Sequence, residues 1–118
     1  IVMLKKDNRL KNKYAFTATY RIKDFHYKDG ITLNVGKKKD NDTPVKIGFV
    51  VSKKTHKRAV KRNRIKRLMR ESLRLILKSG NYNLDNHISL IFTAHTKALG
   101  KSFDEIDSII KSLLSEIN

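Results

Sequence analysis

Cysteine is absent from this chain of 118 residues, which excludes both a disulfide framework and a zinc site built on thiolates. The same absence suits a reducing cytoplasm. No hydrophobic run approaches the length of a membrane-spanning helix, and the first four residues are too short an apolar stretch for a signal peptide. Proline occurs once, at Pro44, in a polar segment (37–44) that is typical of a loop. We therefore expect a cytoplasmic protein that has no membrane partner.

Acidic residues are also scarce. Eleven Asp and Glu face 27 Lys and Arg, which gives a formal net charge of +16. Repulsion among so many like charges weakens the compact state, so the composition predicts a polyanionic partner. A hydrophobic content of 39% and a length typical of one domain predict a single folded unit over residues 1–118.

Three segments alternate apolar and polar residues as strands do, at 31–35, 45–52 and 87–95. Their apolar side is predicted to comprise Ile31, Leu33, Val35, Val45, Ile47, Phe49, Val51, Ile88, Leu90 and Phe92. The opposite side carries small and polar residues, interrupted only by Val50 and Ile91. We expect the sheet to bury the apolar face alone.

Helical periodicity marks a C-terminal segment (102–117), a basic segment (about 58–79) and a shorter N-terminal segment (12–21). Ser102 and Glu105 have the spacing of a capping box at the start of the last helix. Gly80 is expected to end the basic helix. The order of helices and strands predicts an α+β domain.

The basic segment, Lys53–Arg74, holds eleven Lys or Arg residues and one acid, Glu71. At 100° per residue one side of this helix is apolar, formed by Ile65, Met69, Leu73 and Ile76. A different side collects Asn63, Arg67, Arg70 and Arg74. A merely solvated face would mix both signs of charge, whereas arginines on a rigid helix suit phosphates. The segment therefore predicts binding to a nucleic acid.

The string AVKRNRIKRLMRES (59–72), preceded by Lys53 and Lys54, resembles the signature of the protein subunit of bacterial ribonuclease P. NRLKNKYAF (8–16) resembles the opening of that family, and GFVVSKK (48–54) resembles the strand that leads into its basic loop. The resemblance implies a mixed four-stranded sheet with three helices in the order αβββαβα.

The resemblance also implies a function. In that family an endoribonuclease acts as a ribonucleoprotein: a large catalytic RNA, with Mg²⁺ bound mainly through the RNA, removes the 5′ leader from precursor tRNA. The protein subunit supplies no catalytic residue. No metal-binding residue is assigned to this chain, and DNA is not an expected partner. The residues that match the surface for the catalytic RNA are Lys53, Lys54, Arg58, Arg62, Asn63, Arg64, Lys66, Arg67 and Arg70.

The leader is expected in a cleft between the first helix and the polar face of the sheet. Phe16 and Tyr20 match the aromatic residues that contact the leader in the family, although packing of a short helix would explain both rings as well. Lys46, Asn34 and Ser52 lie on the polar face that extended RNA would meet.

Three alternatives remain at this point. A structural RNA-binding protein of the ribosome fits the composition nearly as well, and a transcription factor fits less well because no dimer seam is left. A nuclease that acts alone finds little support, because the four histidines are scattered and no acidic cluster forms. The acids Asp24, Asp29, Asp40 and Asp42 are expected in loops.

Overall fold

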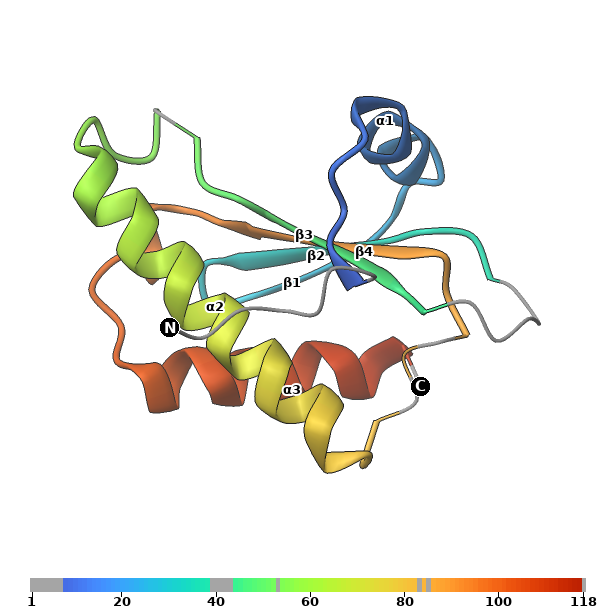
Figure 1. Ribbon diagram of the computed structural model, residues 1–118. Coiled ribbons are helices and arrows are strands. Elements are labelled where there is room, and N and C mark those ends of the chain that lie inside the picture. Colours follow the sequence, from blue (N-terminus) through green and yellow to red (C-terminus); the bar gives the residue numbers. More distant parts are fainter. Residues whose placement is uncertain (1–7, 39–43, 53, 83, 85, 118) are drawn as a thin grey trace.

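The structure is a computed structural model that describes residues 8–38, 44–52, 54–82, 84 and 86–117 (Figure 1). Its elements are, in chain order, α1 (Lys13–Arg21), β1 (Asp24–Lys28), β2 (Ile31–Val35), β3 (Lys46–Val50), α2 (Ala59–Ser79), β4 (Ser89–Ala94), the short 3-10 helix η2 (Thr96–Ala98) and α3 (Phe103–Ile117). Apart from η2, this order is αβββαβα, so the predicted fold class is confirmed.

The four strands form one mixed sheet in the order β1-β2-β4-β3. β2 pairs antiparallel with both β1 and β4, whereas β3 and β4 are parallel neighbours. Parallel strands need a crossover connection, and α2 provides it between β3 and β4. The alternation of residues had not indicated β1, and Asp24, expected in a loop, is its first residue.

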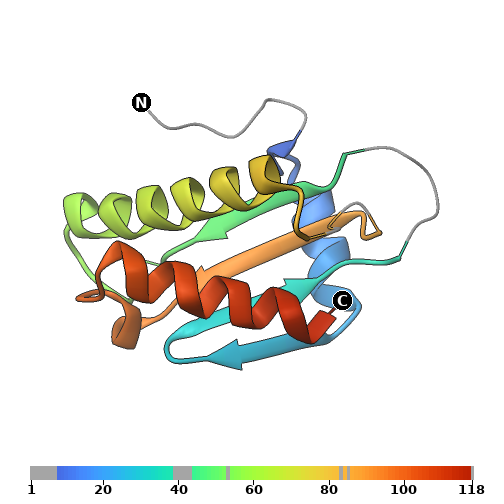
Figure 2. The same ribbon diagram turned by 90° about the horizontal axis from the view of Figure 1, so that it is seen from below.

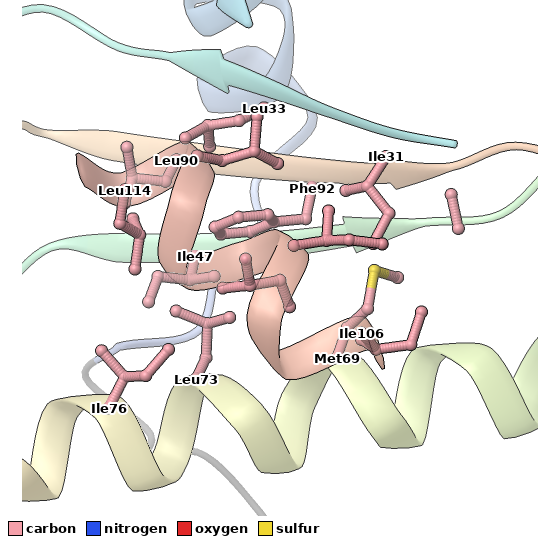
Figure 3. Packing of buried hydrophobic residues seen from close by; sticks show 14 of the residues in the cluster. Ile31, Leu33, Ile47, Met69, Leu73, Ile76, Leu90, Phe92, Ile106 and Leu114 are labelled. Carbon is pink, nitrogen blue, oxygen red and sulfur yellow. The ribbon is translucent and has the colours of Figure 1, made fainter. Parts of the chain in front are cut away.

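α2 and α3 lie side by side on one face of the sheet, and α1 lies on the opposite face (Figures 1 and 2). Side chains from the sheet, α2 and α3 meet in the core, where Phe92, Leu73 and Ile106 are fully buried (Figure 3). The predicted apolar side of the sheet is largely confirmed. Ile88 is the exception: it is 44% exposed because β4 begins only at Ser89 and the alternation does not extend back to it.

The second face of the sheet is not fully open, contrary to expectation. Ile91 belongs to that face and is nevertheless buried, since α1 covers this part of it. α1 is held there by a hydrogen bond between the hydroxyl groups of Thr19 and Ser89. The first helix therefore uses part of the polar face as its own packing surface.

α2 has the rotational phase that its sequence predicts. Ile65, Met69, Leu73 and Ile76 are buried, and Gly80 ends the helix with a left-handed φ of 71°. α3 begins with the expected capping box: the backbone N–H of Ser102 donates to Glu105 Oε1 at 3.1 Å, and the backbone N–H of Glu105 donates to Ser102 Oγ at 3.3 Å. Within the described residues, no helix is both long and apolar enough to cross a membrane.

Candidate nucleic-acid interface

The outward side of α2 presents Lys and Arg side chains that form no ion pair with an acid among the described residues. Arg67 and Asn63 are exposed, and Lys66 and Arg70 are half-buried along the same helix. Within the described residues the ion pairs all lie elsewhere, on β1, η2 and α3 and the turns beside them. We call Asn63, Lys66, Arg67 and Arg70 the α2 ridge. Its charge is available to an external anion.

Two arginines of the same motif are bonded within the protein. Arg62 donates from Nη1 to the backbone oxygens of His56 and Lys57, both at 2.7 Å. Arg64 donates to the backbone oxygens of Leu99 and Lys101, at 3.2 and 3.3 Å. Because these acceptors are neutral, both guanidinium groups keep their net charge.

These bonds position two connections around α2. Arg62 holds the loop that enters the helix, and Arg64 holds the segment between η2 and α3. Lys54 and Arg58 are exposed in or next to that entry loop, and Arg58 is the residue that precedes the first turn of α2. Lys53 lies outside the described residues.

A cleft of about 330 Å³ lies at the outer edge of β3, next to the N-terminal segment. The described residues that line it are Arg9, Leu10, Lys11, Phe16, Ile47, Gly48, Phe49, Lys66 and Arg70. Four of them are cations and none is an acid. We call this the β3-edge cleft. It brings Phe16 of α1 together with two members of the α2 ridge, although these elements lie on opposite faces of the sheet.

The N-terminal segment supplies one wall of this cleft. It follows β3 as an extra partner, with a parallel bridge between Arg9 and Ile47 and a backbone hydrogen bond of 2.9 Å from Leu10 N–H to Ile47 O. No role was predicted from sequence for Arg9 or Lys11. Arg9 and Lys11 flank Leu10, which is buried. In an extended segment, neighbouring side chains point to opposite sides, so this pattern could have indicated that both cations face away from the core.

Gly48 lets the Phe16 ring lie directly on β3. A Cβ atom at this position would lie 2.6 Å from Phe16 Cζ and 2.7 Å from Phe16 Cε1, well inside van der Waals contact. Phe16 itself is half-buried, so one part of the ring packs on the strand while another part borders the cleft. Packing and ligand contact are therefore compatible for this residue.

The other residues expected in the leader cleft are spread over the α1 face. Tyr20 is 41% exposed at the end of α1, and Asn34 is half-buried on β2. Lys46 starts β3, opposite Ser89, whereas Ser52 follows the other end of β3 and its hydroxyl lies 3.2 Å from Thr55 Oγ1. The structure therefore groups Phe16 with Lys66 and Arg70, but it does not bring Lys46 and Ser52 together.

Catalytic or metal-binding groups are not gathered in this part of the molecule. Among the described residues, no three His, Asp or Glu side chains are placed to hold a metal ion. His95 is exposed, and its Nε2 lies 2.8 Å from Thr32 Oγ1. Two further hollows are lined partly by acids, such as Glu105 in one and Asp107 in the other, so they suit a polyanion less well than the β3-edge cleft.

Comparison with known proteins gives a consistent result. The family model described as Ribonuclease P matches residues 4–118. The Ribonuclease P protein component of Clostridium kluyveri is 35% identical over 108 residues, which cover 92% of each chain. The protein of the same name from Clostridium novyi is 32% identical over 111 residues, 94% of each chain.

Solved structures show the same fold. The RNase P protein of Staphylococcus aureus superimposes with a TM-score of 0.75 at 22% identity, covering 96% of this chain and 97% of that one. The RNase P protein of Thermotoga maritima gives 0.76 at 20% identity, covering 93% and 97%. The comparisons do not support the alternative of a ribosomal protein.

Proposed function

The chain belongs to the ribonuclease P protein family, and we propose that it binds the catalytic RNA through the α2 ridge and the 5′ leader of precursor tRNA beside α1. As a ribonuclease P protein component it is part of a ribonucleoprotein that cleaves tRNA precursors. Its partners are accordingly an RNA subunit and a tRNA precursor. The assignment of particular surfaces to these two RNAs is the proposal.

The observation that carries the assignment for the catalytic RNA is that, within the described residues, Lys66, Arg67 and Arg70 of the α2 ridge have no acidic partner. The buried stripe fixes the helix on the sheet, so Asn63, Arg67 and their neighbours are presented in one orientation before any RNA arrives. The planar fork of a guanidinium group loses less freedom per hydrogen bond than an ammonium group does when it binds phosphate oxygens. Lys53, Lys54 and Arg58 extend the proposed contact at the entrance to the helix, and Arg62 and Arg64 add charge while they hold the adjoining loops.

The β3-edge cleft supports the assignment for the leader. Single-stranded RNA is typically bound by an aromatic ring that stacks on a base and by cations that follow the backbone. Phe16 supplies such a ring, and Lys11, Lys66 and Arg70 lie around it. Tyr20, Asn34, Lys46 and Ser52 are proposed to continue this contact over the α1 face.

We propose that Mg²⁺ is held mainly by the catalytic RNA, where it supplies the activated water for cleavage of the phosphodiester bond. The chain's own residues bind and orient RNA, and the described residues contain no cluster of acids and histidines that suits a metal. The cytoplasm is the proposed location.

Binding of substrate with and without its leader tests the proposal. In the complex with the catalytic RNA, Phe16→Ala should weaken binding of precursor tRNA by about 1–3 kcal/mol, the contribution of one stacked base. Mature tRNA, which has no leader, should bind as before. Equal losses for both RNAs would contradict the leader assignment.

Tyr14→Ala is a matched control for this experiment. Tyr14 is an aromatic residue on the same helix and is 84% exposed, but it lies two positions, or about 200°, around from Phe16. Its removal should leave both affinities unchanged.

Incubation of the protein alone with precursor tRNA should give no specific cleavage, whereas cleavage without the RNA subunit would indicate a nuclease that acts by itself.

A further inference from the structure

β1 carries two aromatic rings that the core does not use. Phe25 is 62% exposed and Tyr27 is 56% exposed. In the register of the sheet they pair with Asn34 and Thr32, which alternate with the buried Leu33 on β2. Residues directly opposite in an antiparallel pair point to the same side, so both rings lie on the α1 face.

The charged residues of β1 lie on the other side. His26 is paired with Leu33, and its ring lies 3.2 Å from Asp24 and 3.5 Å from Glu116 of α3. Lys28 donates to Ser112 of α3 at 2.9 Å. The strand therefore uses its polar residues to contact α3 and turns its two largest apolar side chains away from the core.

Hydrogen-bonding groups adjoin these rings. Tyr27 and His95 are in ring contact, with centroids 6.1 Å apart and planes inclined by 44°. His95 Nε2 lies 2.8 Å from Thr32 Oγ1, next to Tyr27 across the strands. We call Phe25, Tyr27, Thr32 and His95 the β1-edge platform. Two exposed rings with a hydroxyl and an imidazole beside them can stack on bases and bond their edges.

The platform lies on the same face of the sheet as the surface proposed for the leader. One row across the sheet runs from Phe25 through Asn34 and Ile91 to Gly48, which lies under Phe16. α1 covers the middle of this row, where Ile91 is buried. The next row runs from Tyr27 through Thr32 and Thr93 to Val50, and its members on β2, β4 and β3 are only half-buried.

The dimensions suit an extended strand of RNA. Phe25 and Tyr27 are two residues apart on one strand, so their Cα atoms are separated by about 6.8 Å. Phe25 and Gly48 are three strand spacings apart, about 14 Å. Rings at such intervals can receive successive or nearby bases of one unpaired strand.

Charge favours RNA as the occupant. The net charge of +16 attracts polyanions to the whole molecule, and Arg21 and Lys23 are exposed in the connection from α1 to β1. The acids nearest to the platform in sequence have cationic or histidine partners: Asp24 lies beside His26, and Asp29 lies 3.5 Å from Lys97 Nζ. No acid is presented on the α1 face of β1.

We propose that the β1-edge platform binds unpaired nucleotides of the 5′ leader that lie farther from the cleavage site than those held at Phe16. This inference rests on the proposed function, because it extends the same strand beyond the β3-edge cleft. It assigns the two edges of the sheet to two parts of one leader. The affinity for precursor tRNA then depends on leader length up to the point at which the platform is filled.

The test measures binding of precursor tRNAs whose leaders are shortened stepwise from the 5′ end. The chain is assembled with its catalytic RNA, and the wild type is compared with the Phe25→Ala/Tyr27→Ala variant. Affinity for the longest leader should fall at least about fivefold for each ring that stacks. Affinity for short leaders and for mature tRNA should not change. Tyr27→Phe, which keeps the ring, should retain most of the affinity for the longest leader that is lost when alanine replaces Tyr27.

Ile88→Ala is the matched control, because Ile88 is 44% exposed and lies outside the platform. It should leave all affinities unchanged, and thermal melting should show that each variant remains folded. Equal weakening of long and short leaders by the double variant would overturn the inference, as would no weakening at all.

Two further outcomes separate this inference from its premise. If wild-type affinity shows no dependence on the leader, the proposed function fails and the platform fails with it. If short leaders are bound through Phe16 but added nucleotides bring no gain, only the platform is overturned. β1 is also an edge strand, so self-association abolished by the double variant, with leader binding intact, would assign the rings to a second copy of the chain and overturn the inference.

Discussion

Alanine in place of Gly48 tests whether the Phe16 ring lies on β3 as described. The added Cβ would approach Phe16 Cζ to 2.6 Å, so the ring must move. Overpacking of this kind costs about 1–3 kcal/mol, and the low end applies because a half-buried ring can swing outward. Alanine loses less backbone conformational freedom on folding than glycine does, so the substitution also stabilises the strand by about 0.5–1 kcal/mol. We therefore expect only a small net destabilisation, of up to about 0.5 kcal/mol.

The sign of this effect should depend on Phe16. In a Phe16→Ala background the clash is gone, and only the backbone term remains, apart from a contact of 3.3 Å with Leu10. Gly48→Ala should then stabilise the protein by about 0.5 kcal/mol or more. Such a reversal is a coupling between neighbouring residues that a double-mutant cycle measures.

Urea unfolding of the four proteins in the cycle provides the free energies, and leader-dependent binding of precursor tRNA provides the functional readout. Gly48→Ala should weaken leader binding when Phe16 is present and have no further effect when it is absent. The same destabilisation in both backgrounds would refute the placement of the ring on β3, and with it the position of α1 over the sheet.

Three further predictions concern α2 and α3, the helices on the face of the sheet opposite α1. Leu73→Ala should destabilise the protein by about 2–5 kcal/mol in thermal or urea unfolding, because Leu73 is fully buried. Leu75→Ala, at a site 41% exposed on the same helix, should destabilise it much less. Similar losses of stability would mean that the rotational phase of α2 is wrong. Arg67→Ala should weaken binding to the catalytic RNA and reduce the slope of log K against log salt by about one, and an unchanged slope would show that Arg67 contacts no phosphate. Hydrogen bonds from the backbone N–H and then the hydroxyl of Ser102 lower the pKa of Glu105, so this carboxylate stabilises the fold at neutral pH and ceases to do so as the pH falls through its lowered pKa. The stability difference between the wild type and Glu105→Ala should therefore shrink on acidification, and a difference that is constant with pH would exclude the charged capping box.

The elements that sequence predicted best are those whose pattern is set by burial on one side. The basic helix was placed at about 58–79 and spans Ala59–Ser79, because its apolar residues recur with the helical period. β2 was predicted at 31–35 and occupies Ile31–Val35, since its alternate residues are buried. The capping box of α3 was recognisable because its two partners are three residues apart in sequence.

β1 was not predicted from the residue pattern, and the reason is physical. A strand at the edge of a sheet needs little apolar surface on its inner side, and here His26 takes the inner position while Phe25 and Tyr27 face outward. The apolar residues of β1 therefore follow the reverse of the usual pattern. The family resemblance implied four strands, but the residues themselves did not indicate where the fourth one lay.

The sequence indicated candidate residues for the site, but it did not indicate how they are arranged. The α2 ridge follows from helical geometry alone, but its junction with Phe16 depends on where α1 and the N-terminal segment pack against β3. The hydrogen bonds from Arg62 and Arg64 to backbone oxygens could not be predicted from sequence either, because every residue has a carbonyl oxygen that could accept them. Contacts between distant segments decide these features, and residue patterns do not encode them.

Leader removal by the reconstituted particle at low Mg²⁺ tests the account most directly. α2 packs on the sheet with one side, and we propose that it binds the catalytic RNA with the other. The wild-type chain should accelerate cleavage of precursor tRNA by the catalytic RNA. An Asn63→Ala/Arg67→Ala variant that melts like the wild type, and that keeps the cleft residues Lys66 and Arg70, should lose much of that acceleration. If this folded variant supports cleavage as well as the wild type, the α2 ridge is not the surface that binds the catalytic RNA.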